Sequence, residues 1–164
     1  MLGKTQVQCE TAIAAPIEEV WAIVQDSTLL PQWMPNVDHT VITTEQSKAV
    51  GEIRQCEVSL SGRSGQLVEQ CVEFAPLQKI SFKVQHDSFG FSRLISDLSY
   101  AMLLETSGPH HTQVRLEYYY QEKGVIGWAV NALMIKPQWD PLCLAMLDGL
   151  KQFAEKRQNP PISG

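Results

Sequence analysis

A long stripe of apolar residues near the end of the chain constrains the fold more than any other feature. Its members recur at intervals of three and four residues, which places them on one broad face of a helix. They are Trp139, Leu142, Cys143, Met146, Leu147, Leu150 and Phe153. Such a face must be covered by another layer, and the strand-like segments upstream provide the cover. Because a long helix laid across a strongly curved sheet can enclose a cavity, the stripe predicts a fold with an internal cavity.

The segments before this helix predict one strand, two short helices and then six more strands. Residues 5–14 alternate between apolar and polar, as in a half-buried strand. Pro16 suits the start of a helix, and Ser27 is the expected N-cap of a second short helix that ends at Trp33. Further strands are expected at 37–45, 51–60, 65–74, 78–86, 95–106 and 112–121. Glycine and proline at the joints favour antiparallel hairpins, so this order predicts an α+β fold.

The composition is typical of one folded domain. With 164 residues, of which 44% are hydrophobic and 19% charged, the chain is long enough to bury a sizeable core. We expect a single domain over residues 1–158 and a disordered tail over 159–164. The net charge of −5 and the scattered lysines and arginines argue against nucleic acid as a partner, and against non-specific binding to an anionic membrane.

Localisation and cysteine chemistry follow from similar arguments. We see neither a signal-peptide pattern nor an apolar run of spanning length, so we expect a cytoplasmic protein without stable membrane insertion. The four cysteines, Cys9, Cys56, Cys71 and Cys143, are far apart and form no C-x-x-C pair. In a chain with its own core, we expect them to be reduced and mostly buried.

Four stretches, in the right order along the chain, carry a family resemblance. The first two are TAIAAPIEEVWAIVQD and STLLPQWMPNV, in the opening strand, turn and helices. The other two are VRLEYYYQEKGVIGW, from the last strand and its loop, and LDGLKQFAEKR, from the closing helix. The chain resembles the START/Bet v 1-like (SRPBCC) superfamily, in its polyketide cyclase/dehydrase branch. The resemblance implies a helix-grip fold, in which a curved seven-stranded antiparallel sheet wraps around the C-terminal helix. It also implies two short helices between strands 1 and 2 and a cavity between sheet and helix.

The resemblance implies a class of function without naming a ligand. Members of the superfamily bind lipids, sterols, polyketides, quinones or plant hormones, and some are cyclases or aromatases. We therefore expect a binding protein for a small hydrophobic ligand (a lipid, polyketide, quinone or aromatic compound) rather than an enzyme. One alternative is a polyketide cyclase/dehydrase-like lyase or isomerase that uses no metal. The other is a protein-interaction module that uses the exposed sheet edge or residues 124–135.

Strand alternation predicts which side chains face the cavity. Arg54, Gln70 and His86 share the parity of the apolar residues on their strands, so they are expected on the inner face. A few polar groups among apolar walls are typical of a small-molecule pocket. For Gln70, a bond to a neighbouring buried group is an equal alternative. Arg54 and His86 lie near strand ends, where a solvated side chain is favoured over a ligand contact.

Aromatic side chains complete the predicted ligand site. Tyr100, Tyr118 and Tyr120 have the inward parity of their strands, and each offers a large apolar body with one hydroxyl group. At least one of them is expected to be a core residue whose hydroxyl reaches the surface. Trp33 and Trp128 are assigned to the cavity mouth by the resemblance, with ordinary packing as an equal alternative.

No catalytic set in the chain maps residue by residue onto a known cyclase. Arg54, Gln70, His86 and Tyr118 could polarise a carbonyl or move a proton, but they could equally orient a passive ligand. Met146, on the stripe of the last helix, is the expected helix contact. We expect no cofactor. We also expect no metal site, because the adjacent histidines at 110 and 111 sit in a Gly-Pro turn where their rings diverge.

The segment just before the last helix is predicted to move. Gly124 and Gly127 lie within it, and Pro137 and Pro141 follow it. Together they are expected to break the chain so that residues 125–135 act as a gate while the helix beyond stays docked.

Overall fold

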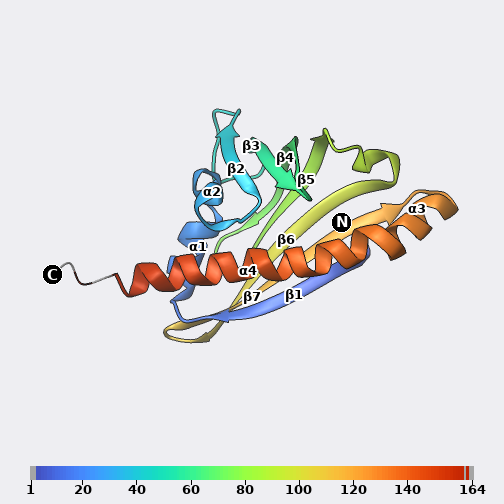
Figure 1. Cartoon of the computed structure of the whole chain (residues 1–164). Coiled ribbons are helices and arrows are strands. Elements are labelled where there is room, and N and C mark those ends of the chain that lie inside the picture. The colour runs from blue at the N-terminus through green and yellow to red at the C-terminus, as the bar shows by residue number, and fades with distance from the viewer. Residues whose placement is uncertain (1–2, 161, 163–164) are drawn as a thin grey trace.

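All seven strands form one antiparallel sheet that curves around the C-terminal helix (Figure 1). The computed structural model describes residues 3–160 and residue 162. In space the strands run in the order β1-β7-β6-β5-β4-β3-β2. Their bounds are β1 (Thr5–Ile13), β2 (Val37–Ile42), β3 (Ile53–Leu60), β4 (Arg63–Ala75), β5 (Lys79–Asp87), β6 (Ile95–Gly108) and β7 (His111–Glu122). The expected α+β helix-grip fold is therefore confirmed.

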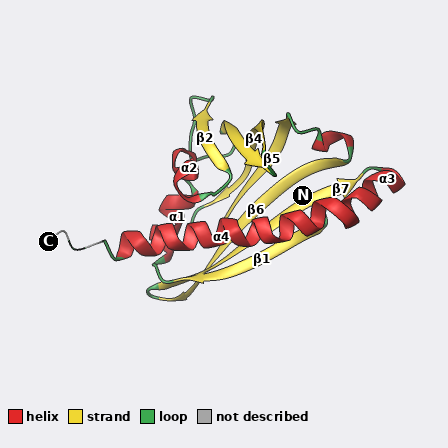
Figure 2. Cartoon of the chain, viewed as in Figure 1, coloured by secondary structure: helices red, strands yellow, loops and turns green. Residues whose placement is uncertain are grey.

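The helices fall into three groups along the chain (Figure 2). Between β1 and β2 lie α1 (Ile17–Val24), the 3-10 turn η1 (Ser27–Leu29) and α2 (Leu30–Trp33). A 3-10 turn, η2 (Phe91–Arg93), lies between β5 and β6. After β7 come α3 (Gly124–Val130), the π-helical turn η3 (Asn131–Ile135) and α4 (Lys136–Gln158). No helix among the described residues is long and apolar enough to cross a bilayer. The cytoplasmic location stays a prediction.

The apolar stripe of α4 packs on the concave face of the sheet, as its periodicity predicts. Cys143, Met146, Leu147 and Leu150 are buried there, and the flanking members of the stripe are half-buried. Burial of such side chains stabilises a fold by roughly 1.5–3 kcal/mol each. The stripe therefore joins the helix to the sheet.

The second short helix begins one residue earlier than expected. Asp26, and not Ser27, is the N-cap of η1, because its Oδ1 accepts a hydrogen bond of 3.0 Å from the backbone N–H of Thr28. The prediction for Ser27 was wrong in this respect. With the cap supplied by its neighbour, the Ser27 side chain turns into the protein and is buried. It becomes part of the site described below.

Residues 124–158 form one continuous helical run, and this corrects the predicted break before α4. Pro137 lies in the first turn of α4 and Pro141 lies inside it, yet the helix continues through both. A proline ring clashes with the carbonyl one turn upstream, and the wider π-helical turn of η3 lies just before Pro137. Movement of 125–135 as a gate stays a prediction. The helix ends at Gln158, and the predicted disordered tail includes residues 161, 163 and 164, which lie outside the described residues.

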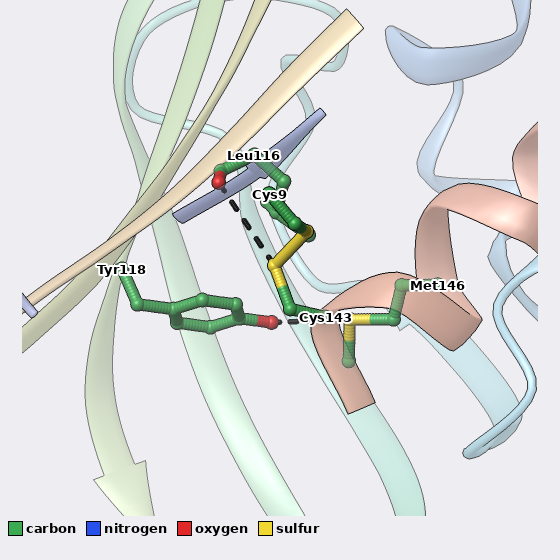
Figure 3. The surroundings of a disulfide bond; sticks show 5 residues. All are labelled: Cys9, Leu116, Tyr118, Cys143 and Met146. Atoms are coloured by element: carbon green, nitrogen blue, oxygen red, sulfur yellow. Dashed lines mark hydrogen bonds between the residues drawn. A yellow bond between two sulfur atoms is a disulfide. The ribbon is translucent and has the colours of Figure 1, made fainter. Parts of the chain in front are cut away.

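A disulfide bond between Cys9 and Cys143 joins β1 to α4 (Figure 3). Their Cα atoms are 6.3 Å apart although 134 positions separate them in the sequence. The expectation that all four cysteines are reduced was therefore wrong for these two. Strand alternation turns Cys9 inward and the helical stripe turns Cys143 toward it, so packing brings the two sulfur atoms together. Cys56 and Cys71 are free and buried.

Candidate functional site

The space between sheet and helix holds an inner cavity of about 70 Å³. Its walls come from α2, from strands β2 to β7, from η2 and from α4, and they are mostly apolar. The residues that line it include Leu30, Met34, Val58, Leu67, Val84, Leu98 and Leu142, together with Arg54, Cys56, Glu69, Tyr100, Tyr118 and Met146. A volume of this size holds a few atoms of a ligand or a few waters, and not a whole drug-sized molecule.

An outer groove of about 600 Å³ adjoins the inner cavity. It lies between the β3–β4 turn, the segment around η2 and the helical run from Val130 to Leu142. The same five side chains line both spaces, namely Asn36, Leu60, Phe91, Trp139 and Leu142. The groove has the volume that small-molecule sites commonly have. Because these five side chains border both spaces, the two form one candidate site with a deep end and an entrance.

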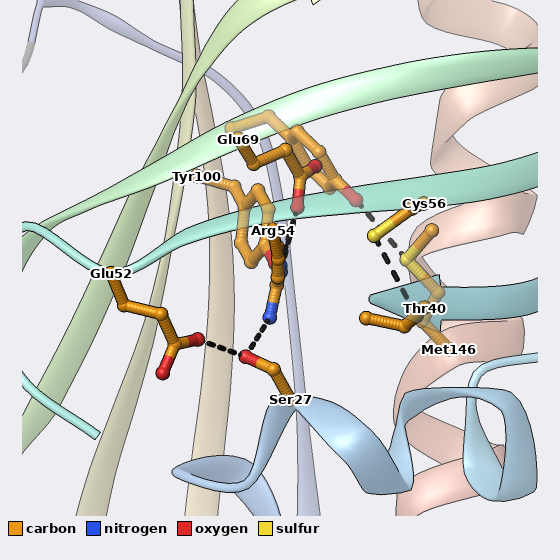
Figure 4. Close-up of polar contacts among 9 residues, drawn as sticks. Ser27, Thr40, Glu52, Arg54, Cys56, Glu69, Tyr100 and Met146 are labelled. Carbon is orange, nitrogen blue, oxygen red and sulfur yellow. Dashed lines mark hydrogen bonds and ion pairs between the residues drawn. The ribbon is translucent and has the colours of Figure 1, made fainter. Parts of the chain in front are cut away.

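Arg54 forms the polar end of the inner cavity (Figure 4). Its side chain is 2% exposed, although its place near a strand end had favoured a solvated side chain. Its Nε donates to Oε2 of Glu69 at 2.8 Å, and its Nη2 lies 2.7 Å from the same oxygen. Nη2 also donates to the hydroxyl of Tyr100, and the guanidinium lies over the Phe82 ring, 3.6 Å from its centroid. Arg54 is therefore held in one position by an acid, a phenol and a ring.

A second buried acid lies behind Arg54. Nη1 of Arg54 donates to Oγ of Ser27 at 3.1 Å, and Ser27 in turn donates to Oε1 of Glu52 (Figure 4). The other carboxylate oxygen of Glu52 accepts a bond of 2.6 Å from the backbone N–H of Lys48. The buried cluster thus contains two carboxylates and one guanidinium. Its net charge is negative, and this decides which ligands suit the cavity.

The protonation states of Arg54 and Tyr100 follow from their burial and from their neighbours. Burial works to lower the pKa of Arg54, but Tyr100 and Glu69 outweigh it and raise that pKa, so the guanidinium stays charged. Burial also raises the pKa of Tyr100 well above its ordinary value, against the opposing effect of Arg54. Tyr100 is therefore a neutral phenol that accepts a bond from Arg54. The Tyr100 hydroxyl still has its own proton, so it can donate a hydrogen bond to a group in the cavity.

Tyr118 and Met146 close the cavity on the helix side (Figure 3). The Tyr118 hydroxyl donates to Sδ of Met146 at 3.1 Å, and a thioether is a weak acceptor. Its ring also lies 5.5 Å from the Trp139 ring, between centroids. Burial raises the pKa of Tyr118 above its ordinary value. Because the bond to sulfur is weak, this hydroxyl is a second donor that a ligand can recruit.

Two predicted site residues lie outside the cavity because β-bulges change the strand parity. In β4, Cys71 pairs with Phe82 and Glu73 pairs with Ser81, so one extra residue interrupts the alternation. Phe74 consequently faces inward together with Glu69, and Gln70 faces outward, where it bonds to Gln85. The inward position predicted for Gln70 was wrong.

The same reason applies to His86 on β5. Val68 pairs with His86 but Glu69 pairs with Val84, so an extra residue again shifts the alternation. His86 is exposed and lines a polar surface depression of about 250 Å³, away from the inner cavity. Within residues 3–160, no group of three or more His, Cys, Asp or Glu side chains is placed to hold a metal ion.

The other aromatic residues predicted for the site, Tyr120, Trp33 and Trp128, lie outside the inner cavity. Tyr120 is buried beside the cavity and donates to Oδ1 of Asn131 at 2.6 Å, so it fixes the helical run. Trp33 is buried in the core and lines neither cavity nor groove. Trp128 is exposed on the outside of α3. Four of the nine predicted residues therefore line the inner cavity, namely Arg54, Tyr100, Tyr118 and Met146. Their contact with a ligand stays a prediction.

Sequence reasoning missed Glu69, although the turn between β3 and β4 contains the signal. Ser61 and Gly62 both have positive φ, as a two-residue type I′ hairpin requires. Such a loop pairs Leu60 with Arg63 and, by counting along both strands, Arg54 with Glu69. A buried arginine needs a charged partner, and this register names it.

Comparison with known proteins places this fold and cavity in one family. The family model for polyketide cyclase / dehydrase and lipid transport proteins matches residues 4–155. The chain therefore belongs to this family. No curated protein has a significantly similar sequence.

Solved structures with little sequence identity share the fold. A START superfamily protein from Mycobacterium smegmatis is 18% identical, with a TM-score of 0.77 over 94% of this chain and 99% of that chain. The Zhui aromatase/cyclase from Streptomyces sp. R1128 is 16% identical, with a TM-score of 0.79 over 96% of this chain and 98% of that one. A norcoclaurine synthase from Thalictrum flavum is 14% identical, with a TM-score of 0.73 over 95% and 99%. At these identities the likeness shows the fold alone.

Proposed function

We propose that this chain binds a small, mostly apolar molecule whose uncharged polar end enters the inner cavity. The observation that carries the proposal is the buried Arg54–Glu69–Tyr100 cluster at the deep end of an otherwise apolar space. Buried charges cost free energy, and a fold that needed only a packed core would do as well with apolar side chains. The body of the ligand lies in the outer groove, where apolar burial contributes about 25 cal/mol per Å².

The charge of the cluster favours a neutral polar end over an anion. In the described part of the chain, Arg54 is the one basic side chain that lines the inner cavity, and Glu69 already pairs with it. Glu52 adds a second negative charge through Ser27. A carboxylate that entered the cavity would meet a negative cluster in a medium of low dielectric constant. A hydroxyl group can accept from the Tyr100 and Tyr118 hydroxyls and donate to the Glu69 carboxylate, whereas a ketone can only accept from the two tyrosines.

The test compares ligands that differ only in this end group. A long-chain alcohol and the carboxylic acid of the same length are titrated at neutral pH, and binding is followed by displacement of a fluorescent apolar probe. The alcohol is expected to bind at least about tenfold more tightly, a difference of about 1.4 kcal/mol. Equal or tighter binding of the acid contradicts the proposal. Native mass spectrometry of the purified protein checks in parallel for a co-purified neutral ligand.

A matched pair of variants on one helix shows whether the ligand occupies this site. Leu142 lines both spaces, whereas Leu144 is exposed two residues further along α4. Leu142→Trp is expected to block the entrance and abolish binding, and Leu144→Trp is expected to leave it unchanged. If both variants bind like the wild type, the ligand lies elsewhere.

A second candidate function is catalysis of the cyclase or dehydrase type. The observation that favours it is that a carboxylate and a phenol polarised by Arg54 face the same apolar cavity. Glu69 would take a proton from a carbon next to a carbonyl group, and Tyr100 would donate a hydrogen bond to the carbonyl oxygen. Two of the similar structures are named as an aromatase/cyclase and a synthase.

The enzyme candidate is tested with the variants Glu69→Gln and Tyr100→Phe. A poly-β-ketone substrate is incubated with each protein, and the products are separated by liquid chromatography. A cyclase would lose turnover by about 10²–10⁴-fold in either variant while it still binds the substrate. Substrate that is recovered unchanged from the wild type would leave the binding proposal as the function.

A further inference from the structure

The helical run before α4 carries five of its large apolar side chains on the outside. Val125 and Leu133 are 82% and 77% exposed, and Ile126, Trp128 and Met134 are exposed as well. These five residues, called the apolar ridge below, lie on successive turns of one helix. Isolated exposed apolar residues are common, but five large ones within one short helical segment mark a surface that binds something.

The inner face of the same run combines Gly127 and the polar Asn131 with the apolar Val130 and Ile135, so the run carries apolar side chains on both faces. Gly127 packs so closely on the η2–β6 segment that a Cβ atom there would lie 2.6 Å from the Leu94 carbonyl oxygen. Asn131 is 4% exposed and bonds to Tyr120 and, at 2.9 Å, to Oε1 of Glu122. These contacts fix which face points inward. The outward direction of the apolar ridge is therefore built into the fold.

The chemistry of the apolar ridge fits a lipid surface. No side chain on its outer face offers a hydrogen bond except the indole N–H of Trp128, whereas protein interfaces carry about one hydrogen bond per 100–200 Å². Residues 124–135 contain no charge, and exposed lysines, Lys123 and Lys136, stand at both ends. Aliphatic side chains with tryptophan between flanking lysines are typical of a helix that lies in the interface of a membrane.

We infer that the apolar ridge docks this protein on the surface of a phospholipid bilayer. The helix lies in the interface and does not span it, with Lys123 and Lys136 at the level of anionic headgroups. The net charge of −5 belongs to the whole chain, whereas the two charged residues directly beside residues 124–135 of the helical run are Lys123, whose Nζ also donates to the backbone oxygen of Ser92, and Lys136. Val130 and Met134 of the same run line the outer groove. In the docked protein the entrance of this groove therefore lies next to the bilayer.

Vesicle flotation tests the docking directly. The full chain is mixed with vesicles of phosphatidylcholine, alone or with phosphatidylglycerol, and the bound fraction is measured after centrifugation. Trp128 is the exposed one of the four tryptophans, since Trp21 and Trp33 are buried and Trp139 is half-buried. We expect binding to the mixed vesicles with a blue shift of tryptophan fluorescence, and weaker binding when Lys136 is replaced in Lys136→Glu.

A matched pair of variants identifies the surface. Ile126→Ser with Leu133→Ser removes two side chains of the apolar ridge, keeps Trp128 as the reporter and is expected to lower vesicle affinity by at least about tenfold. Val50→Ser changes another exposed apolar residue, which is 56% exposed in the β2–β3 connection, and is expected to have no effect. Leu142→Trp is expected to bind vesicles normally, which separates docking from the proposed ligand binding.

Three results would overturn the inference. In the first, the wild type fails to float with either kind of vesicle. In the second, the double serine variant floats as well as the wild type. In the third, the wild type forms dimers in analytical ultracentrifugation and the double variant does not, which would make the apolar ridge an interface between two copies of the chain.

Discussion

Arg54 of β3 and Glu69 of β4 are paired residues on neighbouring strands, and their side chains form an ion pair of 2.7 Å that is almost fully buried. The pairing is set by the two-residue turn at the other end of the hairpin, where Ser61 and Gly62 both have positive φ. A local turn thus determines which acid meets the arginine inside the protein. Because neither charge can be solvated there, each depends on the other.

Removal of Glu69 should therefore lower the free energy of unfolding much more than removal of a partly exposed acid on the same strand. Glu69→Ala is expected to lower the free energy of unfolding by about 3–5 kcal/mol, because it leaves Arg54 charged and buried. Glu73, paired with Lys79 at 2.8 Å and 44% exposed, is the control. It also accepts a bond of 2.7 Å from Ser81, so Glu73→Ala is expected to cost about 1–2 kcal/mol. Urea denaturation measures both. Equal losses would mean that Arg54 finds water or another partner.

The double variant Arg54→Met with Glu69→Leu separates stability from recognition. It is expected to recover most of the stability that Glu69→Ala loses, because apolar side chains of similar size often replace a buried ion pair without loss. It should at the same time lose the preference for a polar end group in the alcohol and acid titration. A double variant as unstable as Glu69→Ala would contradict this account.

The cysteine chemistry predicts three different thiol counts. Burial raises the pKa of Cys56 and of Cys71 to about 11, so at pH 8 roughly one thiol in a thousand is ionised. A thiol reagent such as Ellman's reagent is therefore expected to react very slowly with the folded protein. It should find two thiols in denaturant and four after reduction, because Cys9 and Cys143 are joined. Four thiols in denaturant without a reductant would show that this bond is not formed.

Gly149 lets α4 approach α2, and this makes a helix-favouring substitution harmful. A Cβ atom at position 149 would lie 2.1 Å from the backbone oxygen of Trp33, which cannot move aside as a side chain can. Gly149→Ala is expected to lower the free energy of unfolding by about 1–3 kcal/mol, although alanine is favoured over glycine by about 1 kcal/mol in an open helix. Thermal and urea unfolding measure it. An increase in stability would contradict the close approach.

Glu155 predicts a loss of stability in acid. The bond from Lys151 lowers the pKa of this carboxyl below its ordinary value of 4.5, and the N–H of Ala14, 2.9 Å away, adds to the effect. A group whose pKa is lower in the folded state stabilises the fold above its unfolded pKa, and that contribution disappears as the pH falls through the folded pKa. Wild type should therefore be more stable than Glu155→Gln at neutral pH, and the difference should shrink below about pH 4.5. Urea unfolding at several pH values checks this, and a difference that does not change with pH would contradict it.

Much of the architecture follows from local sequence. The alternation of Val114, Leu116, Tyr118 and Tyr120 correctly predicts the inner face of β7, since a strand turns successive side chains to opposite sides. The stripe on α4 is predictable for the corresponding reason in a helix. These periodicities are properties of the backbone, so they hold wherever the regular structure is unbroken.

The site itself was decided by contacts between distant segments. Bulges in β4 and β5 replace Gln70 by Glu69 on the inner face and move His86 out, and a bulge arises from how two strands pair. Cys9 and Cys143 meet because a helix packs across a strand 134 positions away. The burial of Arg54 is tolerated because Glu69, Tyr100 and Ser27 converge on it from β4, β6 and η1. By itself the sequence determined the elements and most of their faces, because these depend on neighbours in the chain. The tertiary structure decided the charge inside the cavity, because that depends on which residues meet across it.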